Sequence, residues 1–242
     1  MEFDISSVEK SLNDTRNSLT LPAKPSLQLA EFLGILAGDG YVAPYDKGND
    51  YRISVFLNLT DEFPYLFYVK NLFFSLFNLE PIVILRSDIN TATLKKDSKG
   101  ITNFLYQTGY SKKNCIVTVP SWVWHTAEFT IPFVRGLFDT DGCISLKRNH
   151  GKNMYYPVAK IDSKDYCLID KLGQWILNYK IPHSIFSSVS FDKRNSKTYS
   201  KKIIQISGYR NVEKLMDLLQ PSNLKHRERW QLAISTKKVG RG

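Results

Sequence analysis

The chain has 242 residues, of which 43% are hydrophobic and 13% aromatic, a composition that supports an ordinary globular core. Its net charge of +10 comes from 33 Lys and Arg residues against 23 Asp and Glu residues, which favours a polyanionic partner such as nucleic acid. An incidentally basic surface is the alternative reading of the charge alone. No stretch approaches the roughly 20 consecutive apolar residues of a transmembrane helix, so no membrane partner is expected.

The three cysteines, Cys115, Cys143 and Cys167, form no CxxC pair, and an odd, sparse set argues against a disulfide framework. This usage predicts a reducing, cytoplasmic location. The four histidines show no zinc-ligand spacing. Residues 1–25 are polar and contain several acids, unlike a signal or transit peptide. We expect them to form a surface extension or a short helix.

Residues 26–125 are expected to form a first repeat that begins with a helix. Ser26 is a plausible N-cap for a helix over 27–38, and Gly40 is expected to end it with left-handed or strained backbone. Thr60 is the expected N-cap of a second helix. The remaining elements predicted for this repeat are strands 41–47, 51–58, 82–86 and 101–108, helix 61–77, a loop over 88–100 and a weakly helical tail.

Residues 126–242 are expected to form a second repeat with the same order of elements. Thr130 is the expected N-cap of its first helix, Pro132 lies in the first turn, and Gly142 follows the helix. Ser163 is the expected cap of the next helix. The remaining predicted elements are strands 143–149, 155–162, 184–191 and 202–207, helix 164–179, a loop over 192–200 and a helical tail. Each repeat therefore reads αββαββα.

One short pattern occurs in both repeats. The sequence Phe-Leu-Gly-Ile-Leu-Ala-Gly-Asp-Gly over 32–40 returns as Val-Arg-Gly-Leu-Phe-Asp-Thr-Asp-Gly over 134–142. Its acids, Asp39 and Asp141, are 141 − 39 = 102 residues apart. A duplication of this length predicts an α+β fold of two pseudo-symmetric αββαββα repeats.

Each copy of the pattern carries a helical stripe of small residues, namely Ala30, Gly34 and Gly38 in the first copy and Pro132, Gly136 and Thr140 in the second. Such stripes predict that the two motif helices pair closely at an interface and bring Asp39 and Asp141 together. Packing of each stripe under its own sheet is the alternative. Paired carboxylates need a neutralising cation, and Mg²⁺ or another divalent ion such as Mn²⁺ suits oxygen ligands. The main-chain carbonyls of Gly38 and Thr140 are further candidate ligands.

Basic residues concentrate in the second repeat. From Gly142 onward there are 20 basic and 7 acidic residues, a balance of +13, which leaves 13 basic and 16 acidic residues before it. Alternation along the predicted strands places polar side chains on shared sheet faces, which can read base edges in a DNA major groove. A merely solvated face is nearly as plausible for any single strand. The candidate DNA-binding residues are Lys47, Arg52, Ser54, Ser145, Lys147, Asn149, Lys160, Ser188, Ser190 and Arg194.

The two motifs and their spacing resemble those of the LAGLIDADG homing endonucleases, in the monomeric form with two motifs, over about residues 27–234. The resemblance implies that the eighth motif position, Asp39 and Asp141, binds metal. It also implies that antiparallel sheets form a DNA-binding saddle, and that one chain cleaves both strands of a long asymmetric DNA site by metal-dependent phosphodiester hydrolysis, leaving short 3′ overhangs. The sixth position is often Asp; Asp139 matches it and Ala37 does not.

Two further catalytic candidates come from the resemblance. Asn58 matches a polar residue that positions water at the end of the second strand, while the corresponding stretch 160–162 is ambiguous. Lys225 fits a basic residue that follows the last helix of a repeat, either as a catalytic group or as a phosphate anchor. The first repeat offers no clear partner for Lys225, which predicts an asymmetric site. The alternative functions are an intron maturase that binds RNA and a DNA-binding regulator without catalysis.

Overall fold

The computed structural model describes residues 1–43, 50–148, 155–192 and 196–239. Contacts divide the chain into two compact units, Met1–Thr140 and Asp141–Gly242. This division falls later than the predicted repeat boundary, between residues 125 and 126, because the second motif helix is grouped with the first unit. The repeat boundary concerns the duplication, and it stays a prediction. No helix in the described part of the chain is long and apolar enough to cross a membrane.

The first unit holds one copy of the αββαββα order and several added elements. Its helices are η1 (Ile5–Ser7), α1 (Leu12–Arg16), α2 (Leu27–Ala37), α3 (Phe63–Phe77), η2 (Ser87–Ile89), α4 (Lys99–Gln107), α5 (Ser121–His125) and α6 (Ala127–Asp141), which runs to the unit boundary. Its strands are β1 (Gly40–Val42), β2 (Arg52–Asn58), β3 (Ile82–Arg86), β4 (Thr91–Asp97), β5 (Ser111–Lys113) and β6 (Ile116–Thr118).

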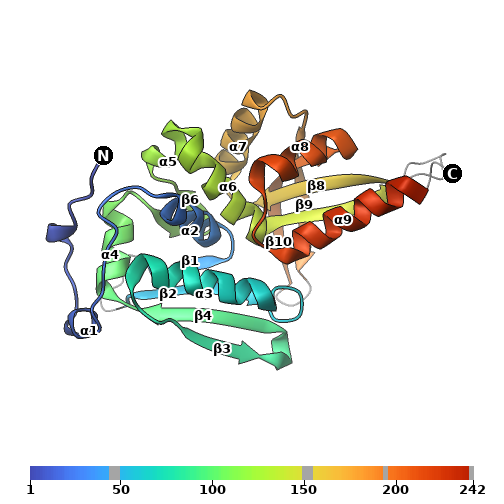
Figure 1. The fold of residues 1–242 in the computed structure, drawn as a ribbon. Helices are drawn as coiled ribbons and strands as arrows, with labels where there is room; N and C mark the ends of the chain where they lie inside the picture. Colours follow the sequence, from blue (N-terminus) through green and yellow to red (C-terminus); the bar gives the residue numbers. More distant parts are fainter. Residues whose placement is uncertain (44–49, 149–154, 193–195, 240–242) are drawn as a thin grey trace. The chain divides into compact units, whose positions relative to one another are not determined.

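The main sheet of the first unit is antiparallel with the strand order β1-β2-β4-β3. One face of this sheet is apolar, since Ile53, Val55 and Leu57 alternate along β2 and are buried. Helix α3 contacts β2 and β4 and covers this face (Figure 1). The opposite face carries Arg52 and Phe56, which are exposed, so the sheet presents one open side.

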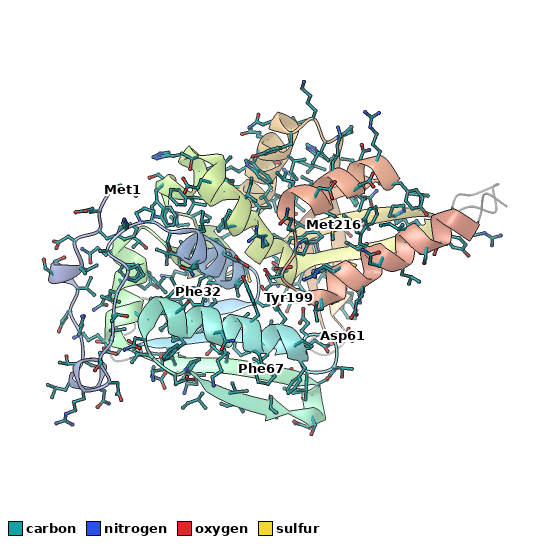
Figure 2. The ribbon with its side chains drawn as sticks, in the orientation of Figure 1. Met1, Phe32, Asp61, Phe67, Tyr199 and Met216 are labelled. Carbon is teal, nitrogen blue, oxygen red and sulfur yellow. The ribbon has the colours of Figure 1, made fainter. Side chains whose placement is uncertain are left out.

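Helix α2 packs on α3 through aromatic rings. Phe32 lies edge-on to Phe73 and Phe77, with ring centroids 5.7 Å away in both cases. Such edge-to-face pairs add about 0.5–1.5 kcal/mol to the burial of the rings themselves. Figure 2 labels Phe32 on α2 and Phe67 on α3; Phe32 is fully buried, whereas Phe67 is exposed. The buried rings of α2 and α3 therefore hold the first motif helix over its own sheet.

The sequence-based prediction is wrong over residues 88–108. The predicted loop 88–100 contains β4, and the predicted strand 101–108 is the helix α4. Ser98 caps α4, since its Oγ accepts from the Ile101 N–H at 3.2 Å, and Ile101, Phe104 and Leu105 are buried at helical spacing. The aromatic and β-branched residues of this segment favour a strand, but helical burial and the cap override that preference.

Several predicted caps also need correction. Helix α6 begins at Ala127, so Thr130 lies within it, and its hydroxyl donates to the carbonyls of Val123 and Thr126. Helix α3 has Glu62 rather than Thr60 at its N-cap position. Gly40 does not adopt positive φ; it begins β1, and a Cβ there would lie 2.3 Å from Leu36 Cα. Close approach, rather than left-handed backbone, therefore requires glycine at this position.

Residues 1–25 belong to the first unit and contain α1, so the predicted short helix is present. Asp14 is buried and accepts hydrogen bonds from the Ser98 hydroxyl at 2.6 Å, the Gly100 N–H at 3.0 Å and the Ser11 N–H at 2.8 Å. Burial raises the pKa of Asp14, but these donors outweigh burial and leave the pKa below its usual value. Asp14 thus joins the N-terminal segment to the start of α4.

We expect Asp14→Asn to lower the free energy of unfolding by about 1–3 kcal/mol at neutral pH, because buried donors lose a charged acceptor. Since the pKa is depressed in the folded state, the carboxylate's contribution is present above the unfolded value of about 3.9 and is lost as pH falls through the folded pKa. Urea unfolding of both proteins between about pH 7 and about pH 3 measures this difference. Glu2→Gln, at an exposed acid of the same segment, is the control. An unchanged difference at low pH would contradict the role of the charge.

The second unit repeats the topology of the first. Its main sheet has the antiparallel order β7-β8-β10-β9, which corresponds to β1-β2-β4-β3. Helices α7 and α8 contact β8 and β10, and α9 contacts β7 and β8 (Figure 1). The elements are β7 (Gly142–Arg148), β8 (Tyr155–Ser163), α7 (Tyr166–Asn178), β9 (Ser184–Asp192), β10 (Lys197–Ser207), α8 (Tyr209–Leu219) and α9 (Leu224–Val239).

The order of elements in the two repeats confirms the predicted fold class. The first repeat runs α2-β1-β2-α3-β3-β4-α4 and the second runs α6-β7-β8-α7-β9-β10-α8. Two details differ from the prediction in the second copy. Asp165, not Ser163, caps α7 by accepting from the Leu168 N–H at 3.0 Å, and β10 begins at Lys197, within the predicted loop.

Candidate active site and nucleic-acid interface

The two motif helices cross with their backbones in contact. A Cβ added to Gly34 would lie 2.0 Å from the Phe133 carbonyl oxygen, and one added to Gly136 would lie 2.2 Å from the Glu31 carbonyl oxygen. The contact is reciprocal, since each glycine meets the carbonyl three residues before the other glycine. All four residues belong to the first unit. The predicted close pairing of the small-residue stripes is therefore present, and it requires glycine at both positions.

A buried ion pair joins the same two helices. Glu31 of α2 is buried, and its carboxylate accepts from Arg135 of α6 at 3.2 Å and from the Tyr68 hydroxyl of α3 at 2.6 Å. Sequence reasoning did not identify this group. The signal available was an acid immediately before the first motif copy and a base within the second, 104 residues apart. The pair fixes the register of the crossing, because a buried carboxylate without partners is costly.

The two motif acids occupy equivalent places at the ends of their helices. Asp39 follows α2, is partly exposed, and its main-chain carbonyl accepts from the Phe56 N–H at 3.0 Å. Asp141 is the last residue of α6, is partly exposed, and precedes the first residue of β7. Each acid lies five residues beyond the crossing glycine of its own helix. Within the described residues, no three His, Cys, Asp or Glu side chains cluster as a metal site.

Lys112 is the basic group that sequence reasoning failed to find in the first repeat. Its Nζ donates to the carbonyls of Leu36 at 3.1 Å and Gly40 at 2.9 Å, and to the carbonyl of Gly38. The carbonyls of Leu36 and Gly38 lie at the C-terminal end of α2, where helical partners are missing and a cation is favoured, and Gly40 begins β1. Lys112 lies in β5, five residues after α4, as Lys225 lies six residues after α8. Lys112 is a candidate counterpart of Lys225, and the predicted asymmetry of the site stays a prediction; the signal available in the sequence was the place of Lys112 after the last helix of its repeat.

The carbonyl predicted as a metal ligand at Gly38 thus already accepts a hydrogen bond from Lys112. A carbonyl oxygen has two lone pairs, so this bond leaves room for a second interaction. Thr140 lies in the last turn of α6, where carbonyls lack helical partners, and its hydroxyl donates to the carbonyls of Gly136 and Leu137 at 3.0 Å. Asp139, at the sixth motif position, is fully buried.

Asn58 has a structural task in the turn between β2 and α3. Its Oδ1 accepts from the Thr60 N–H at 3.0 Å and from the Asp61 N–H at 2.9 Å. Its role in positioning water stays a prediction. Strand registers identify the corresponding residue in the second repeat: Gly40 pairs with Val55 three residues before Asn58, and Gly142 pairs with Ile161 three residues before Lys164. The ambiguous stretch 160–162 therefore lies two to four residues before the position that corresponds to Asn58.

Lys225 is the second residue of α9 and is partly buried, and its main-chain N–H donates to Asn223 Oδ1 at 3.1 Å. The structure thus places it at the start of a helix that packs on β7 and β8. Its catalytic role stays a prediction.

Four predicted DNA-binding residues share the open face of the second sheet. Strand pairing aligns Lys160 with Cys143 and Gln205, while Ser145 and Lys147 alternate with buried Ile144 on β7. Ser188 pairs with Lys201 on the same face. Burial, together with the neighbouring Lys147, lowers the pKa of Lys160. Gln205 and Lys201 belong to this face as well, although sequence reasoning did not select them.

The open face of the first sheet fits its prediction only in part. Arg52 is exposed and forms an ion pair with Asp97 at 3.8 Å. Ser54 is only 2% exposed, because its strand neighbours Tyr41 and Lys95 are larger and flank it, so its selection as a contact residue is wrong. Lys47, Asn149 and Arg194 lie outside the described residues, as does the side chain of Ser190.

Comparison with known proteins defines the class. Residues 128–220 match the family model of the LAGLIDADG-like domain. Comparison with curated protein sequences found no match. The second repeat is therefore similar to a LAGLIDADG-like domain.

Solved structures extend this likeness over most of the chain. The homing endonuclease I-WcaI bound to its DNA recognition sequence matches with a TM-score of 0.54 and 15% identity, over 86% of each chain. The LAGLIDADG homing endonuclease I-GzeII in complex with its DNA target matches with a TM-score of 0.55 and 10% identity, over 87% of this chain and 90% of that one. At these identities the likeness concerns the fold.

Proposed function

We propose that the protein is a sequence-specific endonuclease that cleaves both strands of double-stranded DNA with the help of a divalent cation, Mg²⁺ or Mn²⁺. The observation that carries this proposal is the reciprocal crossing of α2 and α6 at Gly34 and Gly136, with an acid five residues beyond each glycine. A duplicated helix end with a retained acid suits chemistry on two strands. Two similar proteins of this fold are homing endonucleases with DNA bound.

The residues present fit a hard divalent cation. Asp39 and Asp141 are partly exposed carboxylates, and the carbonyls of Gly38 and Thr140 at the helix ends are further oxygen donors. When bound, such an ion polarises water and stabilises negative charge on oxygen. In the proposed hydrolysis, a water oxygen forms a bond to the scissile phosphorus, the bond from phosphorus to the leaving oxygen breaks, and that oxygen gains a proton.

Lys112 and Lys225 complete the proposed machinery. Each follows the last helix of its repeat, and an ammonium group there stabilises the negative charge that develops on a phosphate in the transition state. Lys225 as a simple phosphate anchor is the competing assignment. The open faces of the two sheets supply the DNA contacts, with Arg52 on the first and Lys147 and Lys160 on the second.

The proposed function is tested by incubating the protein with a library of randomised DNA duplexes and Mg²⁺ or EDTA. We expect a subset of duplexes to be cut in both strands, and only with the cation. Binding of preferred duplexes without cutting would indicate a regulator. Preference for structured RNA over every duplex would indicate a maturase.

Lys112→Met is expected to reduce the single-turnover cleavage rate by at least about tenfold with DNA at saturation, since a group that stabilises transition-state charge is lost. Lys113→Met removes the same charge from the neighbouring, exposed position and is the matched control. Because Lys112 also caps α2, a thermal melt of each variant is needed. Lower thermal stability with a normal cleavage rate would show that Lys112 serves the helix alone.

A further inference from the structure

The open face of the first sheet carries a row of apolar side chains that the charged contacts described above do not explain. Phe56 on β2 pairs with Thr93 on β4, and Thr93 pairs with Ile84 on β3. Phe56 is 46% exposed and Ile84 is 42% exposed. In the adjacent row Ile82, on the same face of β3, is 62% exposed. Phe56 and Ile84 therefore flank Thr93 on the face opposite α3, and Ile82 extends the exposed apolar surface along β3.

The second sheet differs at its matching face. At the register that matches Phe56, Thr93 and Ile84, its row holds Asp162, buried Ile203 and Phe186, which is 41% exposed. The neighbouring positions hold Lys160 between Cys143 and Gln205, and Lys201, which forms an ion pair with Asp162, beside Ser188. The two repeats thus have the same strand order but different surface chemistry. If the two open faces bind the two halves of one DNA site, they recognise different base features.

Basic groups border the apolar row, which makes DNA the fitting occupant. Arg86 lies two residues after Ile84, Lys95 two residues after Thr93, and Arg52 four residues before Phe56, all on the same face. Each of these cations has an exposed acid beside it, since Arg86 pairs with Asp88 and both Arg52 and Lys95 pair with Asp97. Arg86 and Arg52 are about half exposed, so binding would exchange these acids for phosphates on either side of the row. A row of apolar side chains bordered by cations matches a groove floor bordered by two phosphate backbones.

The dimensions of the row suit the major groove. Neighbouring strands are about 4.8 Å apart, so the row from β2 across β4 to β3 spans roughly 10 Å, which corresponds to about three base pairs at 3.4 Å each. The only apolar group that the bases present in the major groove is the C5-methyl of thymine, and Phe and Thr side chains are among those that contact it.

We propose that Phe56, Thr93 and Ile84 form a thymine-methyl recognition strip, so that the half-site bound by the first repeat contains thymines contacted through their methyl groups. This inference rests on the proposed DNA-binding function and adds the base class that one half of the target contains. The half-site bound by the second repeat is read instead by the polar side chains of Lys160, Lys201 and Gln205.

The test replaces thymine by uracil, which removes only the methyl group. A preferred duplex is first selected from a randomised library with the full chain in EDTA, so that binding is measured independently of cleavage. Each thymine of that duplex is then changed to uracil in turn, and affinity is measured by fluorescence anisotropy. We expect one to three uracils, all in one half of the site, to weaken binding by about threefold to fivefold each, which matches the burial of one methyl group.

Variants assign the sensitive half to the strip. Ile84→Ser and Phe56→Ser are at exposed positions, and thermal melts establish that they fold. Each is expected to bind the thymine duplex more weakly and to lose the penalty at one or more uracil positions. Gln205→Ala, on the second sheet, is the matched control and is expected to retain the full uracil penalty.

The outcomes separate this inference from the function on which it rests. Selection of a preferred duplex whose uracil forms all bind normally would overturn the strip and leave the DNA-binding function intact. The strip is also overturned if uracil penalties persist in both serine variants and disappear in Gln205→Ala. If no uracil weakens binding, and the protein self-associates unless it carries Ile84→Ser, the apolar row is a protein contact and the strip is overturned. Failure to select any preferred duplex would overturn the proposed function itself.

Discussion

Asp39→Asn and Asp141→Asn are each expected to reduce DNA cleavage by at least about a hundredfold while leaving DNA affinity within a few fold. Asparagine preserves the shape of the side chain but removes the negative charge that holds a hard cation, so the loss falls on the chemical step. Affinity comes mainly from contacts between basic groups and phosphates, and those contacts remain. Retained affinity with lost cleavage is the signature that distinguishes a catalytic acid from a structural one.

The measurement is single-turnover cleavage of a selected duplex in Mg²⁺, with binding measured separately in EDTA. Asp61→Asn, at an exposed acid before α3, is the control for a general effect of charge (Figure 2). Near-normal Mg²⁺-dependent cutting by either motif variant would remove the paired-acid mechanism. A loss of binding as large as the loss of cleavage would assign the acids to folding or to DNA contact.

Enlarging either crossing glycine is expected to destabilise the chain strongly. In Gly34→Ala and Gly136→Ala the new Cβ meets a main-chain oxygen at 2.0 and 2.2 Å, so the two helices must separate. Overpacking costs about 1–3 kcal/mol where side chains can adjust, and main-chain atoms adjust less, so we expect about 3 kcal/mol or more. This corresponds to a fall in Tm of roughly 6–12 °C for a chain of this size.

Thermal melts of the two alanine variants beside Gln28→Leu test this expectation, since Gln28 lies on the same helix as Gly34 but is exposed. An ordinary helical glycine would be stabilised by alanine, by up to about 1 kcal/mol. The sign of the change therefore decides the matter. An unchanged or higher Tm in Gly34→Ala would contradict the crossing of the two helices at this point.

Prediction from the sequence succeeded for the features that occur in both repeats. The order of elements and the close approach of the motif helices were each supported by two copies, and the structure has both. It failed at α4, because the segment 101–108 was considered alone and its β-branched and aromatic residues favoured a strand. In the second repeat the matching helix α8 has a clearer helical pattern, and alignment of the two repeats along the chain would have exposed the error.

The close crossing of the motif helices was predicted from the sequence, and the metal-binding role of Asp39 and Asp141 stays a prediction. Lys112 escaped notice because the printed acceptors of its Nζ are main-chain carbonyls, and no residue type in α2 indicates such a partner. Ser54 was wrongly selected because alternation gives the face of a residue but not the size of its neighbours on adjacent strands. Contacts of both kinds depend on which strands and helices become neighbours, a property of the folded chain.

The grouping of α6 with the first unit has a consequence for how this duplicated chain can be divided or recombined. A fragment that stops at residue 125 lacks the helix that packs on Gly34 and leaves Glu31 without Arg135, so a buried carboxylate loses its cationic partner. On the ribosome, the first unit can reach its final packing only after Asp141 has left the exit tunnel. If repeats are exchanged between related proteins, a junction after α6 and before β7 therefore keeps the contacts between α2 and α6 intact.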